Sequence, residues 1–241
     1  FPHTCFIFEA EADYDVIRSS KKNNLFPNII TNSQFRKNRL IDCGIEPNKI
    51  FVYGSGRFSP EWFELLKNLT KCHNNVKISK TNVLYFEGIY NNQILEKKVI
   101  DYLSKIKTID LIVKSHPRGI FSEKQILNEK LQKNLRIDFN TPSTKLIYDS
   151  DIIIGTFSSI LIDAFILNKF VIYPKFLLNP NKIKVLYEGK EITAECRNIE
   201  EINNAIKNFQ QNNFDLNKKN LELFMQEYVY GNKPKENILQ N

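Results

Sequence analysis

The sequence predicts an α/β protein in which a parallel β-sheet carries flanking helices. Short apolar runs alternate with amphipathic, helix-like segments along most of the 241 residues. The runs 152–154 and 170–172 are apolar at every position, which is typical of strands covered on both faces. Apolar residues make up 42% of the chain and charged residues 25%, so a substantial core can form in one large domain or two small ones.

The first part of the chain predicts two strands and two helices. In chain order, a strand is expected at 26–31, a helix at 32–42, a strand at 49–53 and a helix at 59–69. Asn32 or Ser33 is expected to cap the first helix, and Gly44 to follow its end. Ser59 and Pro60 form the cap-and-proline pair that begins many helices. A polar stretch at 72–81 then predicts a junction between a partial amino-terminal lobe, 1–75, and a carboxyl-terminal lobe, 76–241.

The second lobe predicts a more regular alternation of strands and helices. Strands are expected at 82–86, 110–114, 135–139, 151–155 and 170–173. Helices are expected at 91–106, 122–133, 141–150, 158–168, 199–210 and 217–229. Apolar residues such as Val99, Ile100 and Leu103 recur at helical spacing, which supports the first of these helices. The two last helices are expected to complete this lobe.

Composition excludes some classes of partner and leaves others open. The net charge is +7, but lysines are scattered without a basic stripe and interleaved aromatics, so no nucleic-acid partner is expected. No apolar run reaches the roughly 18 to 20 residues of a membrane span, and no signal peptide is expected. The chain begins at Phe1, which predicts a fragment or missing preceding residues. Four cysteines without CxxC spacing and only three histidines predict reduced thiols and no metal site. No cofactor is expected.

The loop after the strand at 151–155 is the first candidate ligand site, because ligands of open parallel sheets bind beyond the carboxyl ends of the strands. Gly155 permits a tight turn, and Thr156, Ser158 and Ser159 bring hydroxyls to the start of a helix, where the partial positive charge favours phosphate. Asp163, about one turn further on, is a candidate acceptor for ribose hydroxyls. The alternatives are a Ser158 that only caps the helix and an Asp163 that faces solvent.

The loop after the strand at 110–114 is the second candidate. Lys114, His116 and Arg118 place an ammonium, an imidazole and a guanidinium within five residues, and all can donate to phosphate oxygens. The alternative is a surface turn in which Pro117 fixes the backbone. Together the two loops predict a Rossmann-like lobe that binds nucleotide phosphate.

Weaker candidates lie elsewhere in the sequence. Gly54 and Arg57 follow a strand in a glycine-rich loop, but a plain glycine turn is the better explanation of the pattern. Glu87, next to Gly88 after the strand at 82–86, could add a carboxylate to the site. No triad spacing singles out a catalytic base. Proton acceptors near the start of the chain are His3, Glu9 and Glu11.

The order and spacing of two motifs carry a family resemblance. His116-Pro117, followed some forty residues later by Ser158-Ser159 after a buried strand, resembles the carboxyl lobe of GT-B-fold transferases. The resemblance covers residues 30–175. More narrowly, this region is similar to enzymes that build bacterial surface polysaccharides from cytidine-nucleotide donors, namely sialyltransferases, Kdo transferases and CDP-polyol phosphate transferases. It implies that both motifs contact the donor nucleotide or its phosphates, and that this GT-B-type lobe is joined to an incomplete amino lobe. The family's acidic-acidic-Gly motif has no counterpart here, since 86–88 contains one acidic residue.

The resemblance implies an inverting, metal-independent glycosyltransferase of capsule or lipopolysaccharide synthesis. It would transfer a sugar from a nucleotide-activated, CMP-linked donor to a glycan or glycolipid acceptor. It would act in the cytoplasm, with peripheral contact with the inner face of the bacterial membrane as an option. The alternatives are a CDP-linked glycerol- or ribitol-phosphate transferase, an enzyme of UDP-sugars, and a non-catalytic nucleotide-lobe module that binds a partner enzyme or an anionic membrane.

Overall fold

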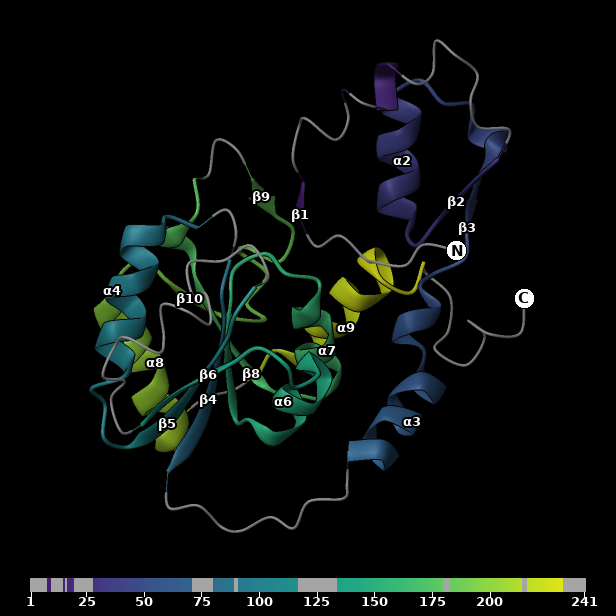
Figure 1. Cartoon of the computed structure of the whole chain (residues 1–241). Helices are drawn as coiled ribbons and strands as arrows, with labels where there is room; N and C mark the ends of the chain where they lie inside the picture. The colour runs from purple at the N-terminus through teal and green to yellow at the C-terminus, as the bar shows by residue number, and fades with distance from the viewer. Residues whose placement is uncertain are drawn as a thin grey trace. The chain divides into compact units, whose positions relative to one another are not determined.

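The computed structural model describes residues 8–9, 15, 17–19, 28–70, 80–88, 91–116, 134–179, 183–213 and 216–231. Its contacts divide the chain into two compact units (Figure 1). Unit 1 comprises Phe1–Leu69, Asn181–Lys190 and Asn217–Asn241, and unit 2 comprises Thr70–Pro180 and Glu191–Leu216. The expected division at residue 75 does not assign the two later segments to the first unit. The helix expected at 122–133 lies outside the described residues.

Unit 2 is built on a parallel sheet of six strands. These are β4 (Thr81–Phe86), β5 (Ile109–Lys114), β6 (Leu135–Asp138), β7 (Ile152–Ile154), β8 (Phe170–Pro174) and β10 (Ala194–Cys196). Their order in the sheet is β10-β8-β7-β4-β5-β6, and every neighbouring pair is parallel. The chain therefore runs from β4 toward one edge and then returns to the other side of β4. This reversal creates a switch point between β4 and β7, where open α/β sheets bind their ligands.

Helices cover both faces of this sheet (Figure 1). On one face lie α4 (Gln93–Leu103) and α8 (Ile199–Gln210), which contact each other, and on the other lie α6 (Ser143–Asp149) and α7 (Ile160–Ile166). Asn92 and Asn198 cap α4 and α8 with their side chains. The members of the hydrophobic core between the sheet and the first pair of helices include Val83, Leu111, Ile154, Val99, Ile100 and Ile202.

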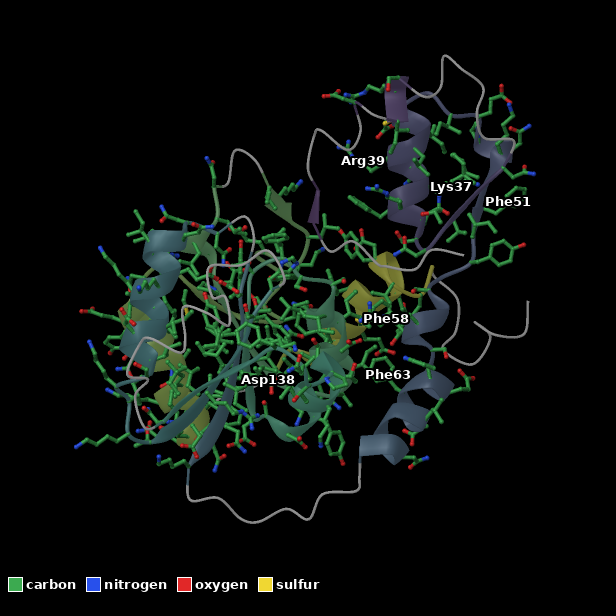
Figure 2. All side chains as sticks on the ribbon, in the orientation of Figure 1. Lys37, Arg39, Phe51, Phe58, Phe63 and Asp138 are labelled. Atoms are coloured by element: carbon green, nitrogen blue, oxygen red, sulfur yellow. The ribbon has the colours of Figure 1, made fainter. Side chains whose placement is uncertain are left out.

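Unit 1 contains a parallel strand pair, β2 (Ile29–Thr31) and β3 (Ile50–Val52), and the helices α2 (Gln34–Asp42) and α3 (Pro60–Thr70). Ser33 caps α2 by accepting a hydrogen bond from the Arg36 amide, which confirms one of the two expected caps. Lys37 reaches from α2 to donate to the Ile50 carbonyl at 2.9 Å, so the helix is tied to β3 (Figure 2). Short 3-10 turns at Pro47–Lys49 and Gly56–Phe58 precede β3 and α3.

A second, antiparallel strand pair in unit 1 joins distant parts of the sequence. It consists of β1 (Phe8–Glu9) and β9 (Lys184–Val185). A third 3-10 turn, Lys175–Leu177, lies in unit 2 after β8.

None of the helices in the described ranges is both long and apolar enough to cross a bilayer.

The last helix, α9 (Lys218–Tyr228), belongs to unit 1, although we expected it to complete the second lobe. Its Tyr228 ring lies 4.9 Å from the ring of Phe35 on α2, and the Asn32 side-chain amide donates to the Tyr228 carbonyl at 2.9 Å. The residues after α9 continue this contact, since the Ser55 amide donates to the Val229 carbonyl at 3.2 Å. The expectation failed because helical periodicity predicts a buried face but does not identify what that face packs against.

Candidate functional site

Three loops meet at the carboxyl edge of the unit 2 sheet. They follow β4, β5 and β7, which lie side by side in parallel register with β4 in the middle. Parallel strands end at the same edge, so the sequence elements after Phe86, Lys114 and Ile154 are neighbours. Side-chain hydrogen bonds join the loop after β4 to each of the other two.

Glu87 joins the loop after β4 to the loop after β5. Its carboxylate Oε2 accepts hydrogen bonds from the Ser115 hydroxyl at 2.8 Å and from the His116 backbone amide at 3.0 Å. Glu87 and Ser115 are buried, and His116 is half-buried. The residue that the sequence marked as a weak site candidate therefore anchors the backbone of the histidine-containing loop.

Glu96 organises the loop after β4 from within α4. Its Oε1 accepts hydrogen bonds from the Tyr85 hydroxyl and the Gly88 amide, both at 3.0 Å, and from the side-chain amide of Asn91. Asn91 in turn accepts a hydrogen bond at its Oδ1 from the Thr156 hydroxyl at 3.0 Å. Asn91 thus bridges the loops after β4 and β7 across the switch point of the sheet.

The carboxyl of Glu96 is electrostatically unusual. It is fully buried, and burial raises its pKa from 4.5 to about 7, with a smaller contribution from the negative charge of Glu87. Hydrogen bonds from Gly88, Asn91 and Tyr85 oppose this shift without cancelling it. Burial likewise raises the pKa of Tyr85, whose hydroxyl faces the same carboxylate. The site therefore contains a carboxyl group that changes charge near neutral pH.

In the loop after β7, the first residues are buried and the hydroxyl of Ser158 is exposed. Gly155 and Thr156 are buried, whereas Ser158 is exposed and its Oγ accepts a long hydrogen bond of 3.4 Å from the Ile160 amide. Ser159 stands at the N-cap position of α7 but makes no side-chain capping bond. Asp163 is only 2% exposed, so the alternative of a solvent-facing charge is wrong. Ser158 and its neighbours are thus placed where a ligand at the switch point can reach them.

Lys114 is engaged with β6. Its ammonium donates to the Phe139 carbonyl at 2.7 Å and lies 3.6 Å from the Asp138 carboxylate, and both charged side chains are nearly buried. Burial favours a higher pKa for Asp138 (labelled in Figure 2), but two hydrogen bonds from Thr141 and the positive charges of Lys114 and Arg136 lower it below its usual value. This arrangement fixes the end of β6 to the end of β5.

The remaining predicted residues do not join this cluster. Gly54 and Arg57 belong to unit 1, where Gly54 has a left-handed φ of 76° and packs against the Tyr230 backbone. The Arg57 guanidinium lies 5.1 Å from the centre of the Phe58 ring. Glu9 pairs with Lys184 in the β1–β9 ladder. Outside the described residues lie Pro117, Arg118, His3 and Glu11.

Sequence reasoning missed Glu96 and Asn91. A signal for Glu96 was present, because it precedes Val99, Ile100 and Leu103 by three, four and seven residues. A carboxylate on the apolar stripe of a helix is buried and needs partners. Asn91 carries no comparable signal. Among the described residues, no group of three or more His, Cys, Asp or Glu side chains could hold a metal ion.

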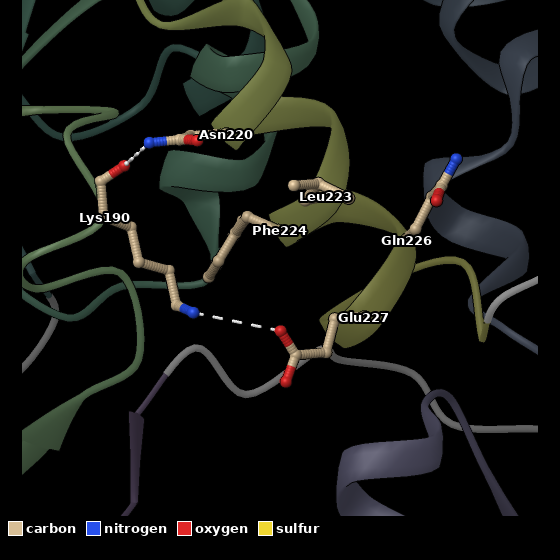
Figure 3. A pocket seen from close by; sticks show the side chains of 6 residues that line it. All are labelled: Lys190, Asn220, Leu223, Phe224, Gln226 and Glu227. Carbon is tan, nitrogen blue, oxygen red and sulfur yellow. Dashed lines mark hydrogen bonds and ion pairs between the residues drawn. The ribbon is translucent and has the colours of Figure 1, made fainter.

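A separate hollow of about 430 Å³ lies along α9 in unit 1 (Figure 3). It is lined by Lys190, Asn220, Leu223, Phe224, Gln226 and Glu227. The Asn220 amide donates to the Lys190 carbonyl at 2.9 Å, and the Lys190 ammonium lies 3.8 Å from the Glu227 carboxylate. None of the predicted donor-binding residues lines this hollow.

Comparisons with known proteins identify the fold. No protein-family model matches the chain, and no curated protein matches it. Among solved structures, the UDP-GlcNAc 2-epimerase of Methanocaldococcus jannaschii, in complex with UDP-GlcNAc and UDP, has a TM-score of 0.51 at 19% identity, covering 75% of this chain and 53% of the epimerase. The wall teichoic acid polymerase TagF has a TM-score of 0.54 at 13% identity, covering 91% of this chain and 56% of TagF.

A third similar structure is Anabaena Alr3699/HepE in complex with UDP-glucose, with a TM-score of 0.50 at 15% identity, covering 94% of this chain and 66% of HepE. The chain thus spans between 53% and 66% of the lengths of these three proteins. The likeness is one of fold. The fold is α/β and Rossmann-like, of the GT-B type, as the sequence predicted.

Proposed function

We propose that this chain is part of a GT-B-type glycosyltransferase of bacterial capsule or lipopolysaccharide synthesis, which transfers a sugar from a CMP-linked donor to a glycan acceptor. The observation that carries the proposal is the hydrogen-bond network that joins the loops after β4, β5 and β7. Glu87 holds the backbone of His116, and Asn91 holds Thr156 next to the exposed Ser158. His116 and Ser158 follow the two strands that flank β4, next to the switch point, and this arrangement supports a nucleotide site there.

The proposed chemistry is a single displacement at the anomeric carbon of the donor sugar. An acceptor hydroxyl oxygen attacks this carbon and gives its proton to a base that we do not assign. The bond from the carbon to the phosphate oxygen breaks, and its electron pair leaves with CMP. His116 and Ser158 would donate hydrogen bonds to the phosphate as its negative charge grows, which stabilises the transition state more than the ground state. A single displacement inverts the anomeric configuration, and this scheme requires no metal ion.

Transfer of a polyol phosphate from a CDP-linked donor is the second candidate. It is favoured by the likeness to TagF, since a TagF variant soaked with CDPG has a TM-score of 0.56 and covers 95% of this chain. In this reaction the acceptor oxygen attacks phosphorus, and the pyrophosphate bond breaks to release CMP. Both candidates release the same nucleotide, so the mass of the product separates them.

Calorimetric titration with CMP, CDP, UDP, ADP and GDP tests the proposal. We expect selective binding of CMP or CDP, and a loss of roughly tenfold or more in affinity for His116→Ala and for Ser158→Ala, because each removes a hydrogen bond to a charged phosphate. Thr108→Ala is the matched control, since it removes an exposed hydroxyl immediately before β5, at the amino edge of the same sheet.

Three results would contradict the proposal. Unchanged affinity in both site variants would refute the assigned site. A preference for UDP would indicate a UDP-sugar donor, the class of ligand bound in the epimerase and HepE structures. Binding to anionic vesicles with no nucleotide binding would favour a non-catalytic module that uses the +7 charge.

A further inference from the structure

The hydrogen bonds of Glu96 converge on a single oxygen atom. Tyr85 of β4, Gly88 of the following loop and Asn91 all donate to Oε1, and Glu96 has no exposed surface. Glu96 begins the buried stripe of α4, whose other members are Val99, Ile100 and Leu103. The buried face of α4 therefore carries the acceptor to which the loop after β4 is attached.

Asn91 transmits this attachment to the loop after β7. Its side-chain amide has one orientation that satisfies both neighbours, with the nitrogen donating to Glu96 and the oxygen accepting from Thr156. Asn91 and Thr156 are both buried. Gly88 is needed for this geometry, since a Cβ at that position would lie 2.5 Å from the Asn91 amide nitrogen. Through Asn91, Glu96 is therefore connected by hydrogen bonds to Thr156, two residues before Ser158.

We propose that Glu96 is a positioning residue, which acts through Asn91 to hold the loop of Thr156 and Ser158 in its donor-binding geometry. The identity of the ligand, a cytidine nucleotide, rests on the proposed function, whereas the coupling within the protein does not. Glu96 makes no contact with the proposed donor in this scheme. Its contribution is to order the loop of Thr156 and Ser158, which makes that contact.

The proposal gains a measurable signature from the charge of Glu96. Its pKa of about 7 means that it ionises in the neutral range, and an ionised acceptor makes hydrogen bonds roughly twice as strong as a neutral one. The titratable groups that act on it are Tyr85 and Glu87. The helix α8, which also packs on α4, contributes the buried apolar residues Ile202, Ala205 and Ile206. The loop is therefore held more firmly as pH rises through 7.

Nuclear magnetic resonance of the full chain without nucleotide tests the coupling. We expect the Gly88 amide and the Thr156 methyl resonance to titrate with a shared midpoint near pH 7, and both titrations to vanish in Glu96→Gln. In Asn91→Ala, the Gly88 amide should still titrate while Thr156 no longer does. Two results would overturn the proposal. In one, the Thr156 methyl resonance of the wild type does not change with pH, and in the other it titrates in Asn91→Ala as it does in the wild type.

The effect on ligand binding is measured with CDP at pH 6 and pH 8. Protonation of the CDP phosphate affects the wild type and Glu96→Gln alike, so the difference between the two proteins reports the charge of Glu96. From pH 6 to pH 8, we expect the affinity of the wild type for CDP to rise by a factor about five times larger than the factor for Glu96→Gln. Equal rises would overturn the role in donor binding. If CDP binds neither protein, the proposed function fails while the resonance experiment still decides the coupling.

Discussion

Replacing Glu96 with Gln should change how the stability of the protein depends on pH. The ordinary pKa of 4.5 applies to the unfolded chain, and the folded protein raises it to about 7 because Glu96 is buried. The folded state therefore binds the proton more tightly, and the free energy of unfolding falls as pH rises from about 4.5 to about 7. It is constant above that range. At about 1.36 kcal/mol for each pKa unit, the total loss is roughly 3 kcal/mol.

Urea unfolding of both proteins at pH 5 and pH 8, followed by far-ultraviolet circular dichroism, measures this effect. Between these values the wild type should lose roughly 2 to 3 kcal/mol more stability than Glu96→Gln, because the amide does not titrate. Glu222→Gln, an exposed position of α9, is the control and should change stability by no more than about 0.5 kcal/mol. An equal pH dependence in the wild type and Glu96→Gln would refute the assignment of a raised pKa to this carboxyl.

Three further substitutions test other contacts. Gly88→Ala should weaken nucleotide binding by roughly tenfold in calorimetry, because the new Cβ displaces the side chain that bridges to the loop after β7. Thr141→Ala removes a hydrogen bond to Asp138 and should cost about 1 kcal/mol in urea unfolding at pH 7. Because the pKa of Asp138 is lowered in the folded protein, this cost should disappear as pH falls through that value. Phe224→Ala should cost about 3 to 5 kcal/mol in thermal or urea unfolding, because its buried ring packs on two tyrosines. Its control is Leu223→Ala, which changes an exposed side chain and should be nearly neutral.

The elements of secondary structure were predictable where local chemistry determines them. The helix expected at 199–210 is α8 with the same bounds, because Asn198 caps it and its apolar residues recur at helical spacing. The buried strand expected at 151–155 is β7, Ile152–Ile154. The short strands β1, β9 and β10 were missed. At two or three residues each, they form only through pairing with distant segments.

The candidate site was predictable in part. The loops after β5 and β7 were identified because polar, phosphate-binding residue types directly follow apolar strands, and parallel pairing brings such loops to one edge. The direction of the Lys114 side chain was not predictable. Lys114 pairs in register with Asp138 on β6, and this cross-strand neighbour attracts its ammonium. The roles of His116 and Ser158 in binding a nucleotide stay predictions.

The sequence by itself determined the α/β class, most of its helices and strands, and two of the loops that form the candidate site. These features depend on periodicity, capping and the residue types that follow a strand, all of which are local. Only the tertiary structure decided that α9 packs with α2, and that Glu96 and Asn91 connect the loops after β4 and β7. These outcomes depend on which surfaces meet and on one amide fitting between a carboxylate and a hydroxyl 65 residues away from it along the chain. Such contacts leave no periodic pattern in the sequence, because the two partners are brought together only by the complete sheet.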